Sequence, residues 1–347
     1  MDNASLTTAS PQGAPARRSA GLDIVRTMAI FLVIGGHFFL NSPFNATPLQ
    51  GPEMYLLAMF KTLILTNVPL FLMLTGYLNL NKRVSKGYYR GLLRVLVSYG
   101  VISLITILVS HFYLHETHTP LQWLLKVTDF SAIKYAWYIE MWIGLFLITP
   151  FLALCWNAIC SKRHHQVLLA TMFVIVALPD CFNRYGVHLV PGYWANMQPV
   201  AFFFMGAYIR TYQPVFRARV VWPLIIALCT INPTLSMLMA PGQPIVHPIG
   251  GGQGIIGMPL CFLLFCALYR LNISELGGGS TLVRRISVLS LDMYLFNYIL
   301  DLLIYPVAKT WTSSLGLLFL TAVPCVFTAA FALSWIKSLF PTPFRYK

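Results

Sequence analysis

The sequence predicts an all-α polytopic membrane protein, a bundle of about ten transmembrane helices with both termini inside (N-in/C-in). Three observations support this class. Charged residues make up only 10% of the 347 residues, whereas a soluble domain carries about 25%. Hydrophobic residues make up 57%, and they gather in long runs instead of the short alternating segments of a membrane β-barrel. The basic residues are distributed unevenly over the segments between these runs.

Ten apolar runs are candidates to span a membrane, because about 20 residues cross the hydrocarbon core. Their expected limits are 22–41, 54–79, 91–113, 136–159, 166–180, 195–211, 220–239, 255–271, 286–307 and 313–337. Residues 1–20 are polar and small, which predicts a disordered cytoplasmic tail. Residues 21–340 are then expected to form a single transmembrane domain.

The distribution of Lys and Arg predicts the orientation, since cytoplasmic segments carry the excess of these residues. With the N-terminus inside, 19 of the 24 Lys and Arg residues fall on inner segments. An even number of spans then returns the C-terminus to the inner side. The net charge of +14 indicates attraction to the anionic lipid of a bilayer. It does not indicate a nucleic-acid partner, because the charges are dispersed over short loops.

The first run carries three ionisable residues, Asp23, Arg26 and His37. Such groups are costly inside a bilayer, so they mark candidate functional sites. Arg26 and His37 are eleven residues apart, or about three helical turns, which places them on nearly one face and roughly 16 Å apart along the axis. Asp23 falls close to that face, where it either pairs with Arg26 or caps the helix start. This polar stripe predicts a path through the membrane and not one compact pocket.

A basic segment between the second and third runs ends in Arg90 and Arg94. Residues four apart share a helix face, so both guanidinium groups are expected at the inner end of the third run. They are candidates for binding a ligand phosphate, and the alternative is that they only fix the topology.

Two carboxylates are expected in the outer half of the membrane, at a depth similar to that of His37. Glu140 lies near the start of the fourth run, and Asp301 lies towards the end of the ninth. The ninth run has four polar residues on one helical face, namely Ser290, Tyr294, Asn297 and Asp301. Glu140 and Asp301 are candidates to orient His37 or a substrate, and the alternative is a structural hydrogen bond between helices.

We expect no metal site. The seven cysteines form no CxxC pair and lie mostly in or beside apolar runs, which indicates thiols without a disulfide or metal role. The spacing of His111 and His115 is compatible with ligation on a helix, but this segment is expected in an outer loop.

These residues resemble the acyltransferase-3 family of bacterial integral membrane acyltransferases. Within it, the chain is similar to the stand-alone polysaccharide O-acetyltransferases related to the enterobacterial common antigen enzyme. The most specific piece, LDIVRTMAIFLVIGGH, is similar to the Arg-x10-His motif of the first family helix at Arg26 and His37. Supporting pieces are VPLFLMLTGYL, the Arg90 and Arg94 pair, AWYIEMWIGLFLITP and ISVLSLDMYLFN. Asn297 stands where many members have histidine.

The resemblance implies an acyltransferase domain over 21–340 in a bacterial inner membrane. It implies transfer of an acyl group, usually acetyl from acetyl-CoA, to a hydroxyl of a cell-envelope polysaccharide or lipid-linked glycan. It also implies that Arg26 and His37 are needed for activity. Acetyl-CoA is then a co-substrate, and no tightly bound cofactor is expected. This agrees with the chemistry, because a sugar hydroxyl needs a general base and imidazole suits that role at neutral pH.

The alternative from another class is a multi-pass transporter or flippase for an envelope glycan or a small solute. In that case the stripe between Arg26 and His37 is a permeation path. Transporters often show inverted halves with paired broken helices, and no convincing internal symmetry is present in the sequence.

Overall fold

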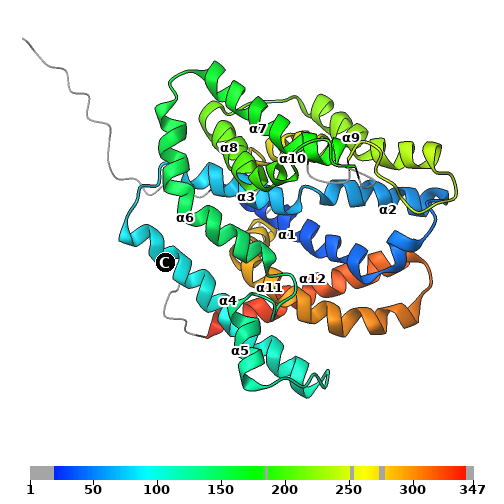
Figure 1. Ribbon diagram of the computed structural model, residues 1–347. Coiled ribbons are helices and arrows are strands. Elements are labelled where there is room, and N and C mark those ends of the chain that lie inside the picture. The colour runs from blue at the N-terminus through cyan, green and yellow to red at the C-terminus, as the bar shows by residue number, and fades with distance from the viewer. Residues whose placement is uncertain (1–18, 184–186, 251–253, 273–277, 341–347) are drawn as a thin grey trace, which may run out of the picture.

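The computed structural model describes residues 19–183, 187–250, 254–272 and 278–340. Within these ranges the fold is helical and contains no strand apart from one isolated bridge between Pro48 and Pro244 (Figure 1). The expected tail, residues 1–20, lies almost wholly outside the described residues, which begin at Ser19.

Twelve α-helices and two short 3-10 helices follow one another in the described chain. They are α1 (Ala20–Asn41), η1 (Pro43–Ala46), α2 (Gly51–Ile64), α3 (Asn67–Asn79), α4 (Lys86–Phe112), α5 (Pro120–Thr128), α6 (Trp137–Ala158), α7 (Lys162–Phe182), η2 (Gly192–Met197), α8 (Gln198–Tyr212), α9 (Ala218–Met239), α10 (Gly257–Leu268), α11 (Gly278–Trp311) and α12 (Leu315–Leu339).

Eight segments of the described chain are long and apolar enough to cross a membrane, with α2 and α3 counted together as one. The prediction of an all-helical membrane protein is therefore confirmed. Two of the ten predicted runs form shorter helices, since α8 has 15 residues and α10 has 12. About 20 residues are needed to cross the hydrocarbon core, so the count of about ten spans stays a prediction, as does the orientation.

The second predicted run, 54–79, consists of two helices instead of one. Helix α2 ends at Ile64, and α3 begins at Asn67. Pro69 has no N–H to donate to a carbonyl four residues earlier, so it is tolerated in the first turn of a helix and not in its interior. The side-chain oxygen of Asn67 accepts a hydrogen bond from the Val68 N–H at 2.6 Å. This N–H lies in the first turn of α3, where backbone donors have no partner within the helix.

Helix α1 lies at the centre of the bundle, with α11 and α12 on one side of it and α2 and α3 on the other (Figure 1). Its apolar residues recur at helical spacing, and Val25, Ala29 and Leu32 are completely buried. Because neighbours surround α1, its polar side chains contact other helices and not only lipid or water. This position makes Arg26 and His37 part of the interior of the protein.

Helices α3 and α8 cross at two glycines. A Cβ atom added at Gly76 would collide with the backbone carbonyl of Phe203, and one added at Gly206 would collide with that of Met73. Small residues let two membrane helices approach this closely, and close approach gives strong van der Waals packing. The reciprocal contact fixes α3, which forms one wall of the candidate site.

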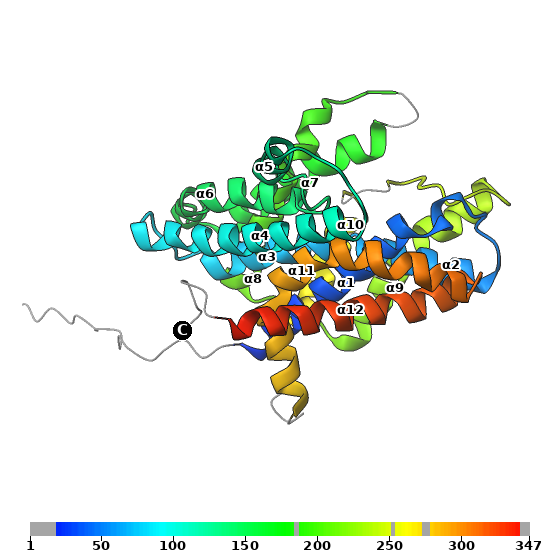
Figure 2. The same ribbon diagram turned by 90° about the horizontal axis from the view of Figure 1, so that it is seen from below.

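Helix α11 is the longest element, with 34 residues. Its N-terminal part projects from the bundle (Figure 2), and the rest packs against α1, α12 and α4. At 1.5 Å per residue it is about 50 Å long. One helix therefore passes both the Arg26 end and the His37 end of α1.

Candidate functional site

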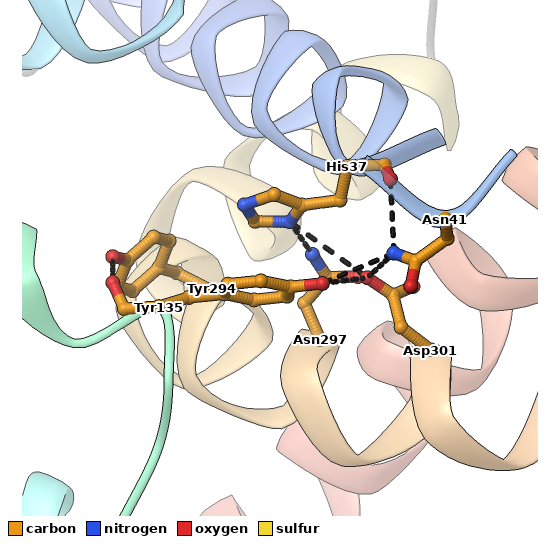
Figure 3. A network of polar contacts seen from close by, with 6 residues as sticks. All are labelled: His37, Asn41, Tyr135, Tyr294, Asn297 and Asp301. Atoms are coloured by element: carbon orange, nitrogen blue, oxygen red, sulfur yellow. Dashed lines mark hydrogen bonds and ion pairs between the residues drawn. The ribbon is translucent and has the colours of Figure 1, made fainter. Parts of the chain in front are cut away.

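His37, near the C-terminal end of α1, is the centre of a polar network (Figure 3). Its Nδ1 atom contacts the side-chain nitrogen of Asn297, and it lies 3.9 Å from the carboxylate oxygen Oδ2 of Asp301. Both partners come from α11. The other ring nitrogen, Nε2, points away from these two side chains in Figure 3. The His37 side chain retains 12% exposure, so the network holds one edge of the imidazole and leaves the other for a further group.

Asp301 is 1% exposed, and polar groups surround one of its carboxylate oxygens. Its Oδ2 atom accepts hydrogen bonds from the Asn41 amide at 3.1 Å and from the Tyr135 hydroxyl at 3.0 Å. Asn41 also donates to the His37 carbonyl oxygen at 2.9 Å. The Oδ1 atom of Asp301 is buried without a hydrogen-bond partner in the part of the chain that the structure describes. A carboxylate beside a histidine can orient the ring and stabilise an imidazolium ion.

Tyr135 belongs to the loop between α5 and α6, far from His37 in the sequence. Its ring stacks on the imidazole, with centroids 3.7 Å apart and planes 15° from parallel. Its carbonyl oxygen accepts a hydrogen bond from the hydroxyl of Tyr294 on α11. Burial, followed by the nearby Asp301 carboxylate, raises the pKa of the Tyr135 phenol far above its usual value, so the phenol remains a hydrogen-bond donor.

A second polar cluster lies at the other end of α1. Arg26 donates to the hydroxyl of Ser287 at 3.1 Å, and Ser287 donates to the Asp23 carboxylate at 2.6 Å. The direct distance from Arg26 Nη1 to Asp23 Oδ1 is 4.0 Å. Asp23 is buried, whereas the Arg26 side chain is 26% exposed. The structure thus shows Asp23 paired with Arg26, largely through Ser287.

A cavity of about 500 Å³ extends from this cluster along α11. Its walls come from α1, α3, α4, α6 and α11, and the lining side chains include Arg26, Thr75, Arg94, Ser287 and Tyr294. From Ser287 to Tyr294 the wall covers seven helical residues, or roughly 10 Å. The cavity thus begins at Arg26 and reaches Tyr294. The Tyr294 hydroxyl donates to the carbonyl oxygen of Tyr135, whose ring stacks on His37.

The other predicted site residues fall in different places. Arg90 and Arg94, one turn apart on α4, are both exposed, and of the two Arg94 lines the cavity. Glu140 is exposed on the first turn of α6. No hydrogen bond or ion pair within the described ranges joins its carboxylate to the His37 network. Of the two carboxylates expected at the depth of His37, Asp301 is the one that the fold brings to it.

Sequence reasoning did not identify Asn41, Tyr135 or Ser287 as site residues. Asn41 follows His37 by four residues, so its position on the same helix face was available from the sequence. Ser287 precedes Tyr294 by seven residues, which again is one helical face. Tyr135 carries no such signal, because it lies in a loop and no period relates it to α1 or α11.

The fold and these two clusters define a class: a multi-pass membrane protein whose central helix carries an arginine at one end and a carboxylate-paired histidine at the other. The family model described as "Acyltransferase domain" (Acyl_transf_3) matches residues 19–339. The chain belongs to the acyltransferase-3 family, as its sequence motifs predicted, and it is a membrane acyltransferase. Searches of curated proteins and of solved structures gave no significant match.

Proposed function

We propose that this protein transfers an acetyl group, or another short acyl group, from acetyl-CoA to a hydroxyl of a cell-envelope polysaccharide or lipid-linked glycan. In the proposal it spans a bacterial inner membrane about ten times with both termini inside, as the charge distribution predicts. Arg26 then lies near the cytoplasmic face and His37 in the outer half. Acetyl-CoA acts as a co-substrate on the cytoplasmic side, without a tightly bound cofactor.

The observation that carries the proposal is the cavity that begins at the Arg26 cluster and reaches Tyr294, although His37 itself does not line it. Arg26 and Arg94 are cationic groups that suit the phosphates of CoA, because guanidinium groups form strong charge-assisted hydrogen bonds to phosphate. Arg90, exposed one turn away on the same helix, extends this basic surface. Asp23 has a supporting part, since its contact with Ser287 holds the Arg26 side chain in place.

In the proposed reaction, His37 is the general base. Its Nε2 takes the proton of the acceptor hydroxyl, the hydroxyl oxygen bonds to the acetyl carbonyl carbon, and the thioester C–S bond breaks. CoA leaves as a thiolate, the His37 imidazolium gives up the proton that it took from the hydroxyl, and the thiolate is protonated on release. One ester and one thiol therefore form from one hydroxyl and one thioester, and the base is regenerated.

The environment of Nδ1 supports this role. In the neutral tautomer with its proton on Nδ1, the Nε2 lone pair is available to accept a proton. The proton on Nδ1 points towards Asn297 and Asp301. If the Asn297 amide is rotated by 180°, its oxygen accepts a hydrogen bond from this proton. That oxygen is otherwise buried without a hydrogen-bond partner among the described residues. Asp301 would then stabilise the imidazolium ion. Glu140 keeps only a proposed role in orienting the acceptor.

Turnover by the purified protein tests the proposal directly. Radiolabelled acetyl-CoA is incubated with a panel of envelope glycans, and ester formation is measured for wild type, His37→Ala and Arg26→Ala. Loss of a general base lowers the rate by about 100-fold to 10,000-fold, whereas His188→Ala, at an exposed histidine outside both clusters, retains wild-type turnover. Full acyl transfer by His37→Ala would remove the general-base assignment. Movement of a glycan or solute across vesicles without ester formation would support the transporter instead.

A further inference from the structure

We propose that Tyr135 is the residue that positions His37 for the reaction, an assignment that rests on the proposed function. Tyr135 does not line the cavity that contains Arg26 and Arg94. It acts through the imidazole and through the Asp301 carboxylate, so it is a positioning residue and not a catalytic one.

The first reason is that Tyr135 restrains the imidazole from a third direction. The contacts of His37 to Asn297 and Asp301 lie at its Nδ1 edge, and they leave the ring free to tilt about that edge. The Tyr135 ring covers one face of the imidazole at 3.7 Å with nearly parallel planes. Stacking of this kind opposes tilting, and it keeps the direction of Nε2 fixed.

The second reason is that the Tyr135 hydroxyl is tied to the carboxylate that faces His37. It donates to Asp301 Oδ2 at 3.0 Å and accepts from the Asn41 amide at 3.0 Å. One side chain therefore aligns both members of the His37–Asp301 pair. Because Asp301 is almost completely buried, few other donors can replace this hydroxyl.

The third reason is that Tyr135 is itself held in place. Its carbonyl oxygen accepts from the Tyr294 hydroxyl, and its ring meets Tyr298 edge-on with centroids 5.2 Å apart. Both partners belong to α11, which also carries Asp301. A loop residue fixed at its backbone, its ring and its hydroxyl can impose a geometry on a neighbouring side chain. Tyr193, which is 86% exposed and lies outside both clusters, provides the control for loss of a phenolic hydroxyl.

The test separates the hydroxyl, the ring and the packing volume. Tyr135→Phe keeps the stacked ring and loses the bond to Asp301, so we expect kcat to fall about tenfold with the KM for acetyl-CoA unchanged. Tyr135→Leu loses both contacts, and we expect a fall of about 100-fold, again without a change in KM. Tyr193→Phe retains wild-type kcat. A parallel loss of kcat and acetyl-CoA affinity in Tyr135→Phe would indicate a general structural defect and overturn the assignment.

A second measurement does not depend on turnover. Diethyl pyrocarbonate modifies exposed imidazoles, and peptide mass spectrometry reports the rate at His37 separately from the other histidines. We expect a severalfold faster modification of His37 in Tyr135→Leu than in wild type or Tyr135→Phe, because only Leu removes the ring that covers the imidazole. Equal rates in all three proteins would overturn the positioning role even if acyl transfer is confirmed. Faster turnover in Tyr135→Leu would also overturn it, since the ring would then act as a gate. If wild type transfers no acetyl group but the modification rates differ as expected, the proposed reaction fails and the placement of His37 by Tyr135 stands.

Discussion

Replacing Asp301 by Asn removes one negative charge from the His37 network and nearly preserves the shape of the side chain. The Asp301 Oδ2 atom lies 3.9 Å from His37 Nδ1. When His37 takes up the proton of the acceptor, this carboxylate stabilises the imidazolium ion. At an effective dielectric constant of about 20, opposite unit charges about 4 Å apart attract by roughly 4 kcal/mol. A loss of that size lowers kcat about a thousandfold, since about 1.4 kcal/mol corresponds to tenfold.

The assay measures kcat for acyl transfer together with the Kd for acetyl-CoA by calorimetry. We expect Asp301→Asn to keep the wild-type Kd, because the proposed donor contacts lie at the Arg26 end of the cavity. The control is Glu116→Gln, which neutralises a partly exposed carboxylate in the connection between α4 and α5, 3.7 Å from His118 Nε2 and outside the His37 network. A kcat within about threefold of wild type, in a variant that still binds acetyl-CoA, would refute the reasoning, since it corresponds to less than about 0.7 kcal/mol.

Three further predictions concern the donor end and the packing. Arg94→Ala weakens acetyl-CoA binding more than Arg90→Ala does, by about tenfold in Kd, because only Arg94 lines the cavity. Gly76→Ala lowers stability by about 2 kcal/mol in thermal unfolding, because the added methyl group meets the backbone of α8. Lys337→Met lowers stability by about 3 kcal/mol, since it leaves a carboxylate on α11 without the ammonium group that lies 2.7 Å from it.

Each of these predictions has its own check. Equal Kd values in the two arginine variants would place the donor phosphates elsewhere on the basic surface. Gly100→Ala, where nothing lies within 4 Å of the added atom, serves as the control for the glycine variant. For the lysine, the double variant Lys337→Met/Asp292→Leu should recover most of the lost stability, because it removes both of these partly buried charges. A double variant as unstable as the single one would contradict this account.

The sequence predicted the parts of the site that depend on one helix at a time. The spacing of Arg26 and His37 placed them at the two ends of one face of α1, and the structure shows one continuous helix from Ala20 to Asn41. The face from Ser290 to Asp301 was likewise readable from the helical period. Ser290 and Tyr294 line the cavity. The Asn297 side chain contacts His37, and the Asp301 carboxylate lies 3.9 Å from it.

The sequence could not show which helices meet. Glu140 and Asp301 were expected at a similar depth, but depth does not determine the rotation of a helix about its axis. Packing of α11 against α1 brings Asp301 to His37, whereas Glu140 remains exposed. Tyr135 was not identified, because a loop has no period from which a facing direction can be read.

The length of α11 has a consequence for how this site can change. One unbroken helix carries Ser287 at the Arg26 cluster and Asp301 at the His37 network. These residues are fourteen apart, or about 21 Å along the axis. Inserting a single residue between them would rotate one half of the helix against the other by roughly 100°, so that only one half could keep its facing side chains. The facing directions of Ser287 and Asp301 are thus coupled through one helix. An insertion or deletion between them must comprise whole helical turns to preserve both sets of contacts.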